Sequence, residues 1–205
     1  MRPLILASAS PRRSELLAAA GYAFTVRPAD VDETPMPYEK PEAYVERLAA
    51  HKAASVAAEV AAEPAAPDGG DDAVVVGADT IVVLGNELLG KPTDAEEARA
   101  MLRRLSGRVH HVLTGVAIHS RELTTAISVE SAVWFRELDD DEIDAYVAGG
   151  EPLDKAGSYA IQGGGAAFVE TIEGPWDNIV GLPVTWLEGL LMPVGIRPTA
   201  ATDRG

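Results

Sequence analysis

The sequence predicts an α/β protein with a mixed sheet, and three observations support that prediction. Apolar, strand-like runs alternate with helical patterns along the 205 residues, without an internal repeat. Residues 73–77 form an apolar run centred on three valines, which is typical of a strand buried on both faces. Residues 109–118 and 123–135 form two long strand-like runs joined by a short polar turn, which predicts an antiparallel pair.

The N-terminal third is predicted to contain two short strands and two helices. A strand at residues 4–7 leads through Ser10, the expected N-cap, into a helix over residues 11–21. The other two elements are a strand at residues 24–26 and a long helix from Pro41 to about residue 60. Residues 61–72, rich in Ala, Pro, Gly and Asp, predict a flexible insertion at a loop tip.

The rest of the chain continues the alternation, and residues 1–193 are predicted to form a single domain. The expected elements are, in order, a short strand at residues 88–89, a helix capped by Thr93 and Glu96, a helix capped by Asp139 and Glu142, a strand at residues 166–172 and a helix at residues 183–191. Residues 194–205 are predicted to be a disordered tail.

Composition excludes several classes of function. Without cysteine the chain has no disulfide, no thiolate zinc site and no cysteine nucleophile, and His110, His111 and His119 lack metal-ligand spacing, which indicates sheet residues. A net charge of −15 argues against binding to a nucleic-acid polymer or an anionic membrane. The apolar runs are too short for a signal peptide or a membrane span, so a cytoplasmic protein is expected.

A pair of arginines is the most informative local feature. Arg12 and Arg13 directly follow Ser10 and Pro11, in the first turn of the predicted helix. A helix N-terminus carries partial positive charge, so each cation there costs roughly 0.3–1 kcal/mol unless an anion neutralises it. Together with Ser8 and the unbonded N–H groups they would form a phosphate cradle, from which either arginine could be removed without loss of stability. The alternative is two solvated surface arginines.

Four further segments carry groups that suit phosphate chemistry, and each has a plainer alternative. Asp79 follows the valine-rich strand, where α/β sheets tend to place ligands, although an Asp there also caps turns. Lys52 lies on the apolar stripe of the long helix and points toward the core, unless it snorkels to solvent. Lys91 follows Gly90 at a strand end, where a solvated loop lysine is equally expected. Residues 154–165 form a Gly-rich loop without a Walker lysine, for which the alternative is a flexible linker.

Seven short motifs occur in the same order as in a known family. They are Ser8-Ala9-Ser10-Pro11-Arg12-Arg13, Asp32-Glu33-Thr34, His51-Lys52-Ala53, Gly77-Ala78-Asp79-Thr80, Gly90-Lys91-Pro92, Ala156-Gly157-Ser158-Tyr159 through Gln162-Gly163, and Asn178-Ile179-Val180-Gly181-Leu182-Pro183. In these motifs the chain resembles the Maf-like nucleoside triphosphate pyrophosphatases, once named for septum formation. One such motif would be weak evidence, whereas seven in order, from Leu4 to Leu191, are specific.

The resemblance implies a mixed α/β fold with two lobes around a central cleft, similar to that of inosine-triphosphate pyrophosphatases. It implies a hydrolase that cleaves the α–β phosphoanhydride of a nucleoside triphosphate to the monophosphate and pyrophosphate, with a house-cleaning role in the nucleotide pool. A homodimer is implied only by analogy. The family name leaves a second function open, a nucleotide-binding regulator of septum formation with little turnover.

The resemblance also implies roles for single residues. Asp79 matches the family's catalytic aspartate, the proton acceptor for the attacking water. Glu33, alone or with Asp79, would bind Mg²⁺ or Mn²⁺, because hard cations prefer carboxylate oxygen. The groups that would hold the triphosphate are Ser8, Arg12, Arg13, Lys52 and Lys91.

Substrate choice is indicated by the Gly-rich loop. The chain resembles the subgroup that acts on dTTP and UTP, in which residues matching Arg12, Thr80 and Gln162 tune specificity. A Gln amide both donates and accepts, which suits the O4 and N3–H edge of uracil or thymine, but the same amide would equally hold a loop together. The alternative substrate is 7-methylguanosine triphosphate, whose subgroup carries Ser-Glu in place of Ile161-Gln162.

Overall fold

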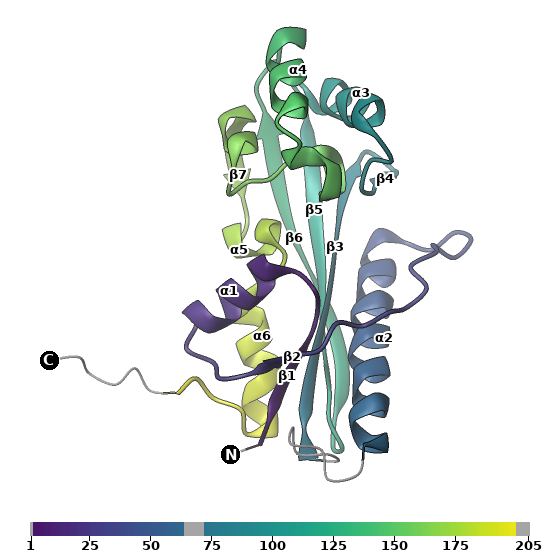
Figure 1. Ribbon diagram of the computed structural model, residues 1–205, viewed down its shortest axis with the longest axis vertical. Coiled ribbons are helices and arrows are strands. Elements are labelled where there is room, and N and C mark those ends of the chain that lie inside the picture. The colour runs from purple at the N-terminus through teal and green to yellow at the C-terminus, as the bar shows by residue number, and fades with distance from the viewer. Residues whose placement is uncertain (1, 64–71, 200–205) are drawn as a thin grey trace, which may run out of the picture. The chain divides into compact units, whose positions relative to one another are not determined.

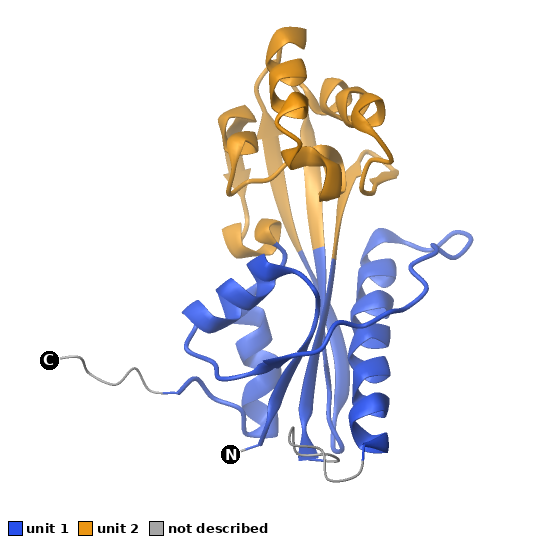
Figure 2. Cartoon of the chain, in the orientation of Figure 1, with its two compact units in different colours: residues 1–79, 114–129, 181–205 blue, residues 80–113, 130–180 orange. Residues whose placement is uncertain are grey.

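The computed structural model describes residues 2–63 and 72–199 (Figure 1). The chain divides into two compact units (Figure 2). Unit 1 comprises residues 1–79, 114–129 and 181–205, and unit 2 comprises residues 80–113 and 130–180. Three strands pass from one unit into the other: β3 (Val74–Leu84), β5 (Val109–His119) and β6 (Thr124–Phe135). The predicted arrangement of two lobes around a central cleft stays a prediction.

Each unit combines helices with its share of the strands. Unit 1 adds β1 (Leu4–Ala7), α1 (Pro11–Ala19), β2 (Thr25–Val26), α2 (Pro41–Ala62), α6 (Val184–Leu191) and the 3₁₀ turn η5 (Met192–Val194). Unit 2 adds β4 (Glu87–Leu89), α3 (Ala95–Leu105), α4 (Asp140–Ala148), the 3₁₀ turns η2 (Glu151–Asp154), η3 (Ala156–Ser158) and η4 (Gly164–Phe168), β7 (Val169–Glu173) and α5 (Trp176–Val180).

The seven strands form one sheet in the order β2-β1-β3-β5-β6-β7, with β4 paired to β3. Strand β1 is parallel to both neighbours, since Ile5 lies opposite Thr25 in β2 and opposite Val75 in β3. Strands β3 and β4, and β6 and β7, pair antiparallel. The sheet is therefore mixed, which confirms the predicted fold class. The three histidines considered above lie on β5, as predicted.

The core of unit 1 explains why β1 and β3 read as continuous apolar runs. Alternate residues of each strand belong to two different buried clusters. One cluster packs Ile5 and Val75 against the apolar residues of α2, and the other packs Leu6 and Val76 with residues of α1 and α6. Both faces of these strands are thus covered by helices, as their unbroken hydrophobicity predicts.

Helix α2 lies unusually close to the sheet at two glycines of unit 1. A Cβ atom at Gly77 would stand 2.0 Å from the carbonyl oxygen of Ala49, and one at Gly115 would stand 2.1 Å from that of Val45. Both contacts are to helix backbone rather than to side chains, so no rotamer change would relieve them. Glycine is therefore required at both positions to seat α2 on β3 and β5.

Two local details of unit 2 correct the sequence reading. The N-cap of α3 is Asp94, whose carboxylate accepts hydrogen bonds from the N–H groups of Glu96 and Glu97, and not Thr93. Thr93 precedes the N-cap, and its N–H and hydroxyl both donate to the carboxylate of Glu97 instead of Glu96. The strand expected at residues 166–172 is β7, which begins only at Val169 because residues 164–168 form a 3₁₀ turn.

The predicted disordered tail is wrong for residues 194–199. Val194 and Ile196 are buried in the core of unit 1, and both the N–H and the hydroxyl of Thr199 donate to the carbonyl oxygen of Gly21. Residues 200–205 and most of the predicted insertion at 61–72 lie outside the described residues. Within the described ranges, no helix is both long and apolar enough to cross a membrane.

Candidate active site

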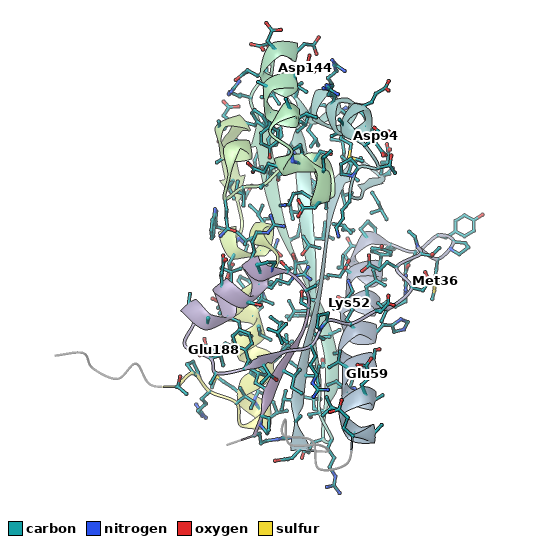
Figure 3. All side chains as sticks on the ribbon, in the orientation of Figure 1. Met36, Lys52, Glu59, Asp94, Asp144 and Glu188 are labelled. Carbon is teal, nitrogen blue, oxygen red and sulfur yellow. The ribbon has the colours of Figure 1, made fainter. Side chains whose placement is uncertain are left out.

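A buried lysine joins two carboxylates in unit 1. The Nζ atom of Lys52 lies 2.6 Å from Oδ1 of Asp79 and 2.6 Å from Oε1 of Glu33. Lys52 and Asp79 are only 9% and 8% exposed, whereas the Glu33 side chain is more than half exposed. Lys52 extends from α2 on the side that faces the strands (Figure 3). It therefore does not snorkel to solvent but forms a buried ion pair.

The close approach of α2 to β3 places this pair. The stripe predicted on α2, Val45, Leu48, Lys52 and Val56, is buried throughout. Ala49 and Ala53, which flank Lys52 along the helix, are the residues whose backbone meets Gly77, and Asp79 follows Gly77 by two residues on β3. The ammonium and the carboxylate are thus brought together by backbone packing that only glycine permits.

The loop that carries Glu33 is tied to α2 by two side chains that sequence reasoning missed. The hydroxyl of Tyr44 donates to the carbonyl oxygen of Glu33 at 2.8 Å, and Arg47 donates to the carbonyl oxygen of Thr34 at 3.3 Å.

Arg47 also binds both carboxylate oxygens of Glu39, and its guanidinium lowers the pKa of Glu39 to about 2. Burial, with smaller contributions from Asp79 and Glu33, raises the pKa of Tyr44 to about 12. The available signal was the position of Tyr44 on the same buried stripe as Lys52.

Arg13 is a structural element of unit 1 as well as a candidate phosphate ligand. Its Nε donates to the carbonyl oxygen of Gly181 at 2.8 Å, and its Nη1 donates to that of Ala78 at 2.9 Å. The same Nη1 lies 3.3 Å from Oγ of Ser8, which also accepts the N–H of Ser10. Burial lowers the pKa of the Arg13 guanidinium, and the charge of Asp79 opposes that shift. Arg13 thereby links the end of β1 and the middle of β3 to the segment before α6.

Arg12 differs from its neighbour. Helix α1 begins at Pro11, so both arginines occupy its first turn as predicted, although the side chain of Ser10 makes no capping bond. The Arg12 side chain is half-buried, and it forms no hydrogen bond or ion pair within the part of the chain that the structure describes. The two arginines are therefore not equivalent, and the expectation that either can be removed without loss of stability does not fit the contacts of Arg13.

Alanine substitutions should separate these two arginines. We expect Arg13→Ala to lower the free energy of unfolding by roughly 1–3 kcal/mol, because it removes a donor from the buried carbonyl groups of both Ala78 and Gly181. Arg12→Ala should leave stability unchanged or slightly higher, because it removes a cation from a helix N-terminus. Thermal or urea unfolding without ligand measures both. Equal destabilisation by the two variants would contradict the distinction.

The remaining candidate residues lie in unit 2. Thr80 follows Asp79 on β3 and is half-buried, and Lys91 is exposed two residues after β4. Gln162 is exposed between η3 and η4.

The Gly-rich loop is not a flexible linker, because it is built of 3₁₀ turns and is anchored by a hydrogen bond from the N–H of Gly157 to the carbonyl oxygen of Gly90. The structure thus gathers Ser8, Arg13, Glu33, Lys52 and Asp79 within unit 1 and leaves Thr80, Lys91 and Gln162 in unit 2.

Glu33 and Asp79 are the two carboxylates of this group that could bind a divalent cation together. Among the described residues there is no cluster of three or more His, Asp or Glu side chains that could hold a metal on its own. Glu33 and Asp79, however, each place an oxygen 2.6 Å from one ammonium nitrogen, so both can reach a single cation. One or two carboxylates completed by water and substrate phosphates is the usual way in which proteins bind Mg²⁺.

Comparison with known proteins identifies the family of the chain. The model of the family described as Maf-like protein matches residues 3–194. The dTTP/UTP pyrophosphatase of Anaeromyxobacter dehalogenans (strain 2CP-C) is 51% identical over 198 residues, which cover 94% of each chain. That of Myxococcus xanthus (strain DK1622) is 53% identical over 193 residues, which cover 94% of this chain and 93% of the relative. That of Hahella chejuensis (strain KCTC 2396) is 48% identical over 196 residues, covering 96% and 94%. The chain therefore belongs to the Maf family.

Proposed function

We propose that this chain is a nucleoside triphosphate pyrophosphatase that hydrolyses dTTP and UTP to the monophosphate and pyrophosphate. Relatives about half identical over nearly the whole chain carry the name dTTP/UTP pyrophosphatase. The observation that carries the chemistry is the buried Lys52, held between Glu33 and Asp79. A carboxylate able to take a proton thus lies beside a cation able to hold a phosphate, as hydrolysis of a polyanion requires.

In this proposal Asp79 is the general base. Its carboxylate takes a proton from the water that attacks the α-phosphorus, and the bond from that phosphorus to the β-phosphate oxygen breaks. Lys52 holds Asp79 through the hydrogen bond to Oδ1 and is placed to neutralise phosphate oxygens as charge moves to the leaving group. Tyr44 keeps Glu33 near this pair by fixing the backbone of its loop.

A divalent cation belongs to the same proposal. Glu33 and Asp79 would hold Mg²⁺ or Mn²⁺, which would supply charge neutralisation on the phosphate oxygens and so prevent repulsion between a triphosphate and the two carboxylates. The other groups proposed to hold the triphosphate are Ser8, Arg12, Arg13, Lys52 and Lys91. Arg12 and Lys91 are the cations best placed to act on substrate alone, because no described residue binds either side chain.

A panel of nucleotides tests the proposed function. Purified protein is incubated with dTTP, UTP, CTP and 7-methylguanosine triphosphate, with and without Mg²⁺ or Mn²⁺, and pyrophosphate and orthophosphate are measured separately. We expect pyrophosphate and monophosphate from dTTP and UTP, only with metal. The Asp79→Asn protein, prepared in parallel, controls for contaminating hydrolases. Binding of nucleotides without turnover by the wild type would support the regulator instead.

We further propose that Arg12, Thr80 and Gln162 recognise the base. The substitution Gln162→Glu tests this role for Gln162. We expect Gln162→Glu to lower kcat/KM for UTP and dTTP by at least about tenfold, because a carboxylate cannot donate to a pyrimidine carbonyl and leaves that group unpaired. The side chain is exposed, so stability should change by less than about 0.5 kcal/mol. Asn86→Asp, which adds the same charge at another exposed turn of unit 2, is the matched control. An unchanged substrate ranking would show that Gln162 does not contact the base.

A further inference from the structure

The turn that carries Gln162 is fixed from both sides by two side chains of unit 2. The N–H of Gly163 donates to the carbonyl oxygen of Ala160 at 3.1 Å, which closes a turn with Gln162 as its third residue. Before the turn, the N–H of Ala160 donates to the hydroxyl of Tyr146 at 3.0 Å. After it, the N–H of Gly164 donates to Oε2 of Glu151 at 3.1 Å.

Tyr146 and Glu151 are also bonded to each other. The hydroxyl of Tyr146 donates to Oε1 of Glu151 at 3.2 Å, so the hydrogen bonds run from the start of the turn through both side chains to its end. Tyr146 projects from α4 and packs edge-on against Phe168, with ring centroids 5.0 Å apart. Burial raises the pKa of Tyr146, which therefore stays a neutral donor at physiological pH.

The glycines of the loop are shaped to these two side chains. A Cβ atom at Gly163 would stand 2.0 Å from Oε1 of Glu151, and one at Gly164 would stand 3.1 Å from Cε2 of Tyr146. A Cβ at Gly165 would meet the carbonyl oxygen of Ala160 at 2.8 Å and the hydroxyl of Tyr146 at 3.1 Å. The loop is therefore glycine-rich because its backbone lies directly on Tyr146 and Glu151, and not because it must be flexible.

The residues before Gln162 are buried and anchor the loop in unit 2. Tyr159 is 5% exposed, and its hydroxyl lies 2.9 Å from Nε2 of the buried His110. Ala160 and Ile161 are also buried, whereas Gln162 is exposed. The arrangement fixes the backbone on both sides of one polar side chain and leaves that side chain accessible.

We propose that Tyr146 and Glu151 form a clamp that positions Gln162, and that nucleobase selection depends on it. This inference rests on the proposed function, in which Gln162 contacts the base. Recognition of a base edge requires hydrogen bonds in a fixed place, and a displacement of about 1 Å in a positioning element commonly costs up to about 10²-fold. Tyr146 and Glu151 are positioning residues, since they act through the backbone of the turn.

The test is a double-mutant cycle on substrate preference. The ratio of kcat/KM for UTP to that for CTP is measured for wild type, Tyr146→Phe, Gln162→Ala and the double variant. We expect Tyr146→Phe to lower the ratio by about fivefold or more, and to have no further effect when Gln162 is already Ala. Tyr22→Phe is the matched control, because it removes a buried hydroxyl that has no partner among the described residues and lies in unit 1.

A second variant keeps the test valid if Tyr146→Phe folds poorly. Glu151→Gln retains an acceptor for the N–H of Gly164 but loses the charge, and it should lower the ratio less than Tyr146→Phe does. A lower melting temperature with an unchanged ratio would show a purely structural role. An equal fall in the ratio on the Gln162→Ala background would also overturn the clamp. A wild type that hydrolyses no nucleotide would instead overturn the proposed function, and the clamp with it.

Discussion

Replacing Asp79 by Asn is expected to lower kcat for dTTP and UTP by roughly 10²–10⁴-fold while nucleotide binding is retained, the usual consequence of losing a general base. The amide has the shape of the carboxylate but cannot take the proton of the attacking water. Folding should survive, because Lys52 keeps its second carboxylate partner, Glu33, at 2.6 Å. A buried lysine left with no partner would be far more destabilising.

Steady-state kinetics, nucleotide binding and thermal unfolding of the same preparation decide this prediction. Asp139→Asn is the matched control, since Asp139 caps α4 in unit 2 and Asn is nearly as good an N-cap. Full activity of Asp79→Asn would remove Asp79 from the role of base. Loss of the fold together with activity would show that the carboxylate is structural.

The largest expected effect on stability is that of Gly77→Ala. The added Cβ would lie 2.0 Å from the carbonyl oxygen of Ala49 and 2.8 Å from the nitrogen of Ala53, both backbone atoms of α2. Relief requires the whole helix to move off the sheet, so we expect the free energy of unfolding to fall by about 3 kcal/mol or more. Activity should fall as well, because the same movement draws Lys52 away from Asp79.

Gly189→Ala in α6 provides the control for Gly77→Ala. A Cβ at Gly189 meets nothing within 4 Å, and alanine is favoured over glycine inside a helix by roughly 0.5–1 kcal/mol. Urea unfolding of the two variants should therefore give shifts of opposite sign. A Gly77→Ala protein with wild-type stability would show that α2 does not approach β3 as closely as described.

Patterns of hydrophobicity predicted most of the fold, because burial on one face leaves a periodic apolar pattern and burial on both faces leaves an unbroken apolar run. The stripe that places Lys52 on α2 is an example. Capping was predicted less well, since Thr93 and Asp94 are both good caps and only the position of the backbone selects Asp94. The tail was misjudged because Val194 and Ile196 are isolated apolar residues whose burial depends on residues distant in the chain.

For the candidate site, the sequence indicated single residues better than the contacts between them. Motifs identified Asp79 and Lys52, but no pattern indicated that they would be bonded to each other. Two partners of Arg13 are the backbone carbonyls of Ala78 and Gly181, and a sequence pattern cannot identify a backbone carbonyl as an acceptor because every residue has one. Tyr44 was missed for the opposite reason, since its ring reads as one more apolar position while its hydroxyl holds the Glu33 loop.

Three hydrogen bonds of Arg13 also bear on how the protein is made. Its acceptors lie 5, 65 and 168 residues away in sequence, and the last of them, Gly181, precedes the helix whose leucines complete the core around β1. A growing chain therefore carries β1, α1 and β3 long before it can close unit 1. Domains fold as units during synthesis, and contacts of long sequence separation form late. We therefore expect Arg13 to take its final position beside Ser8 and Ala78 only after α6 has been translated, and a chain that ends before α6 to lack a working site.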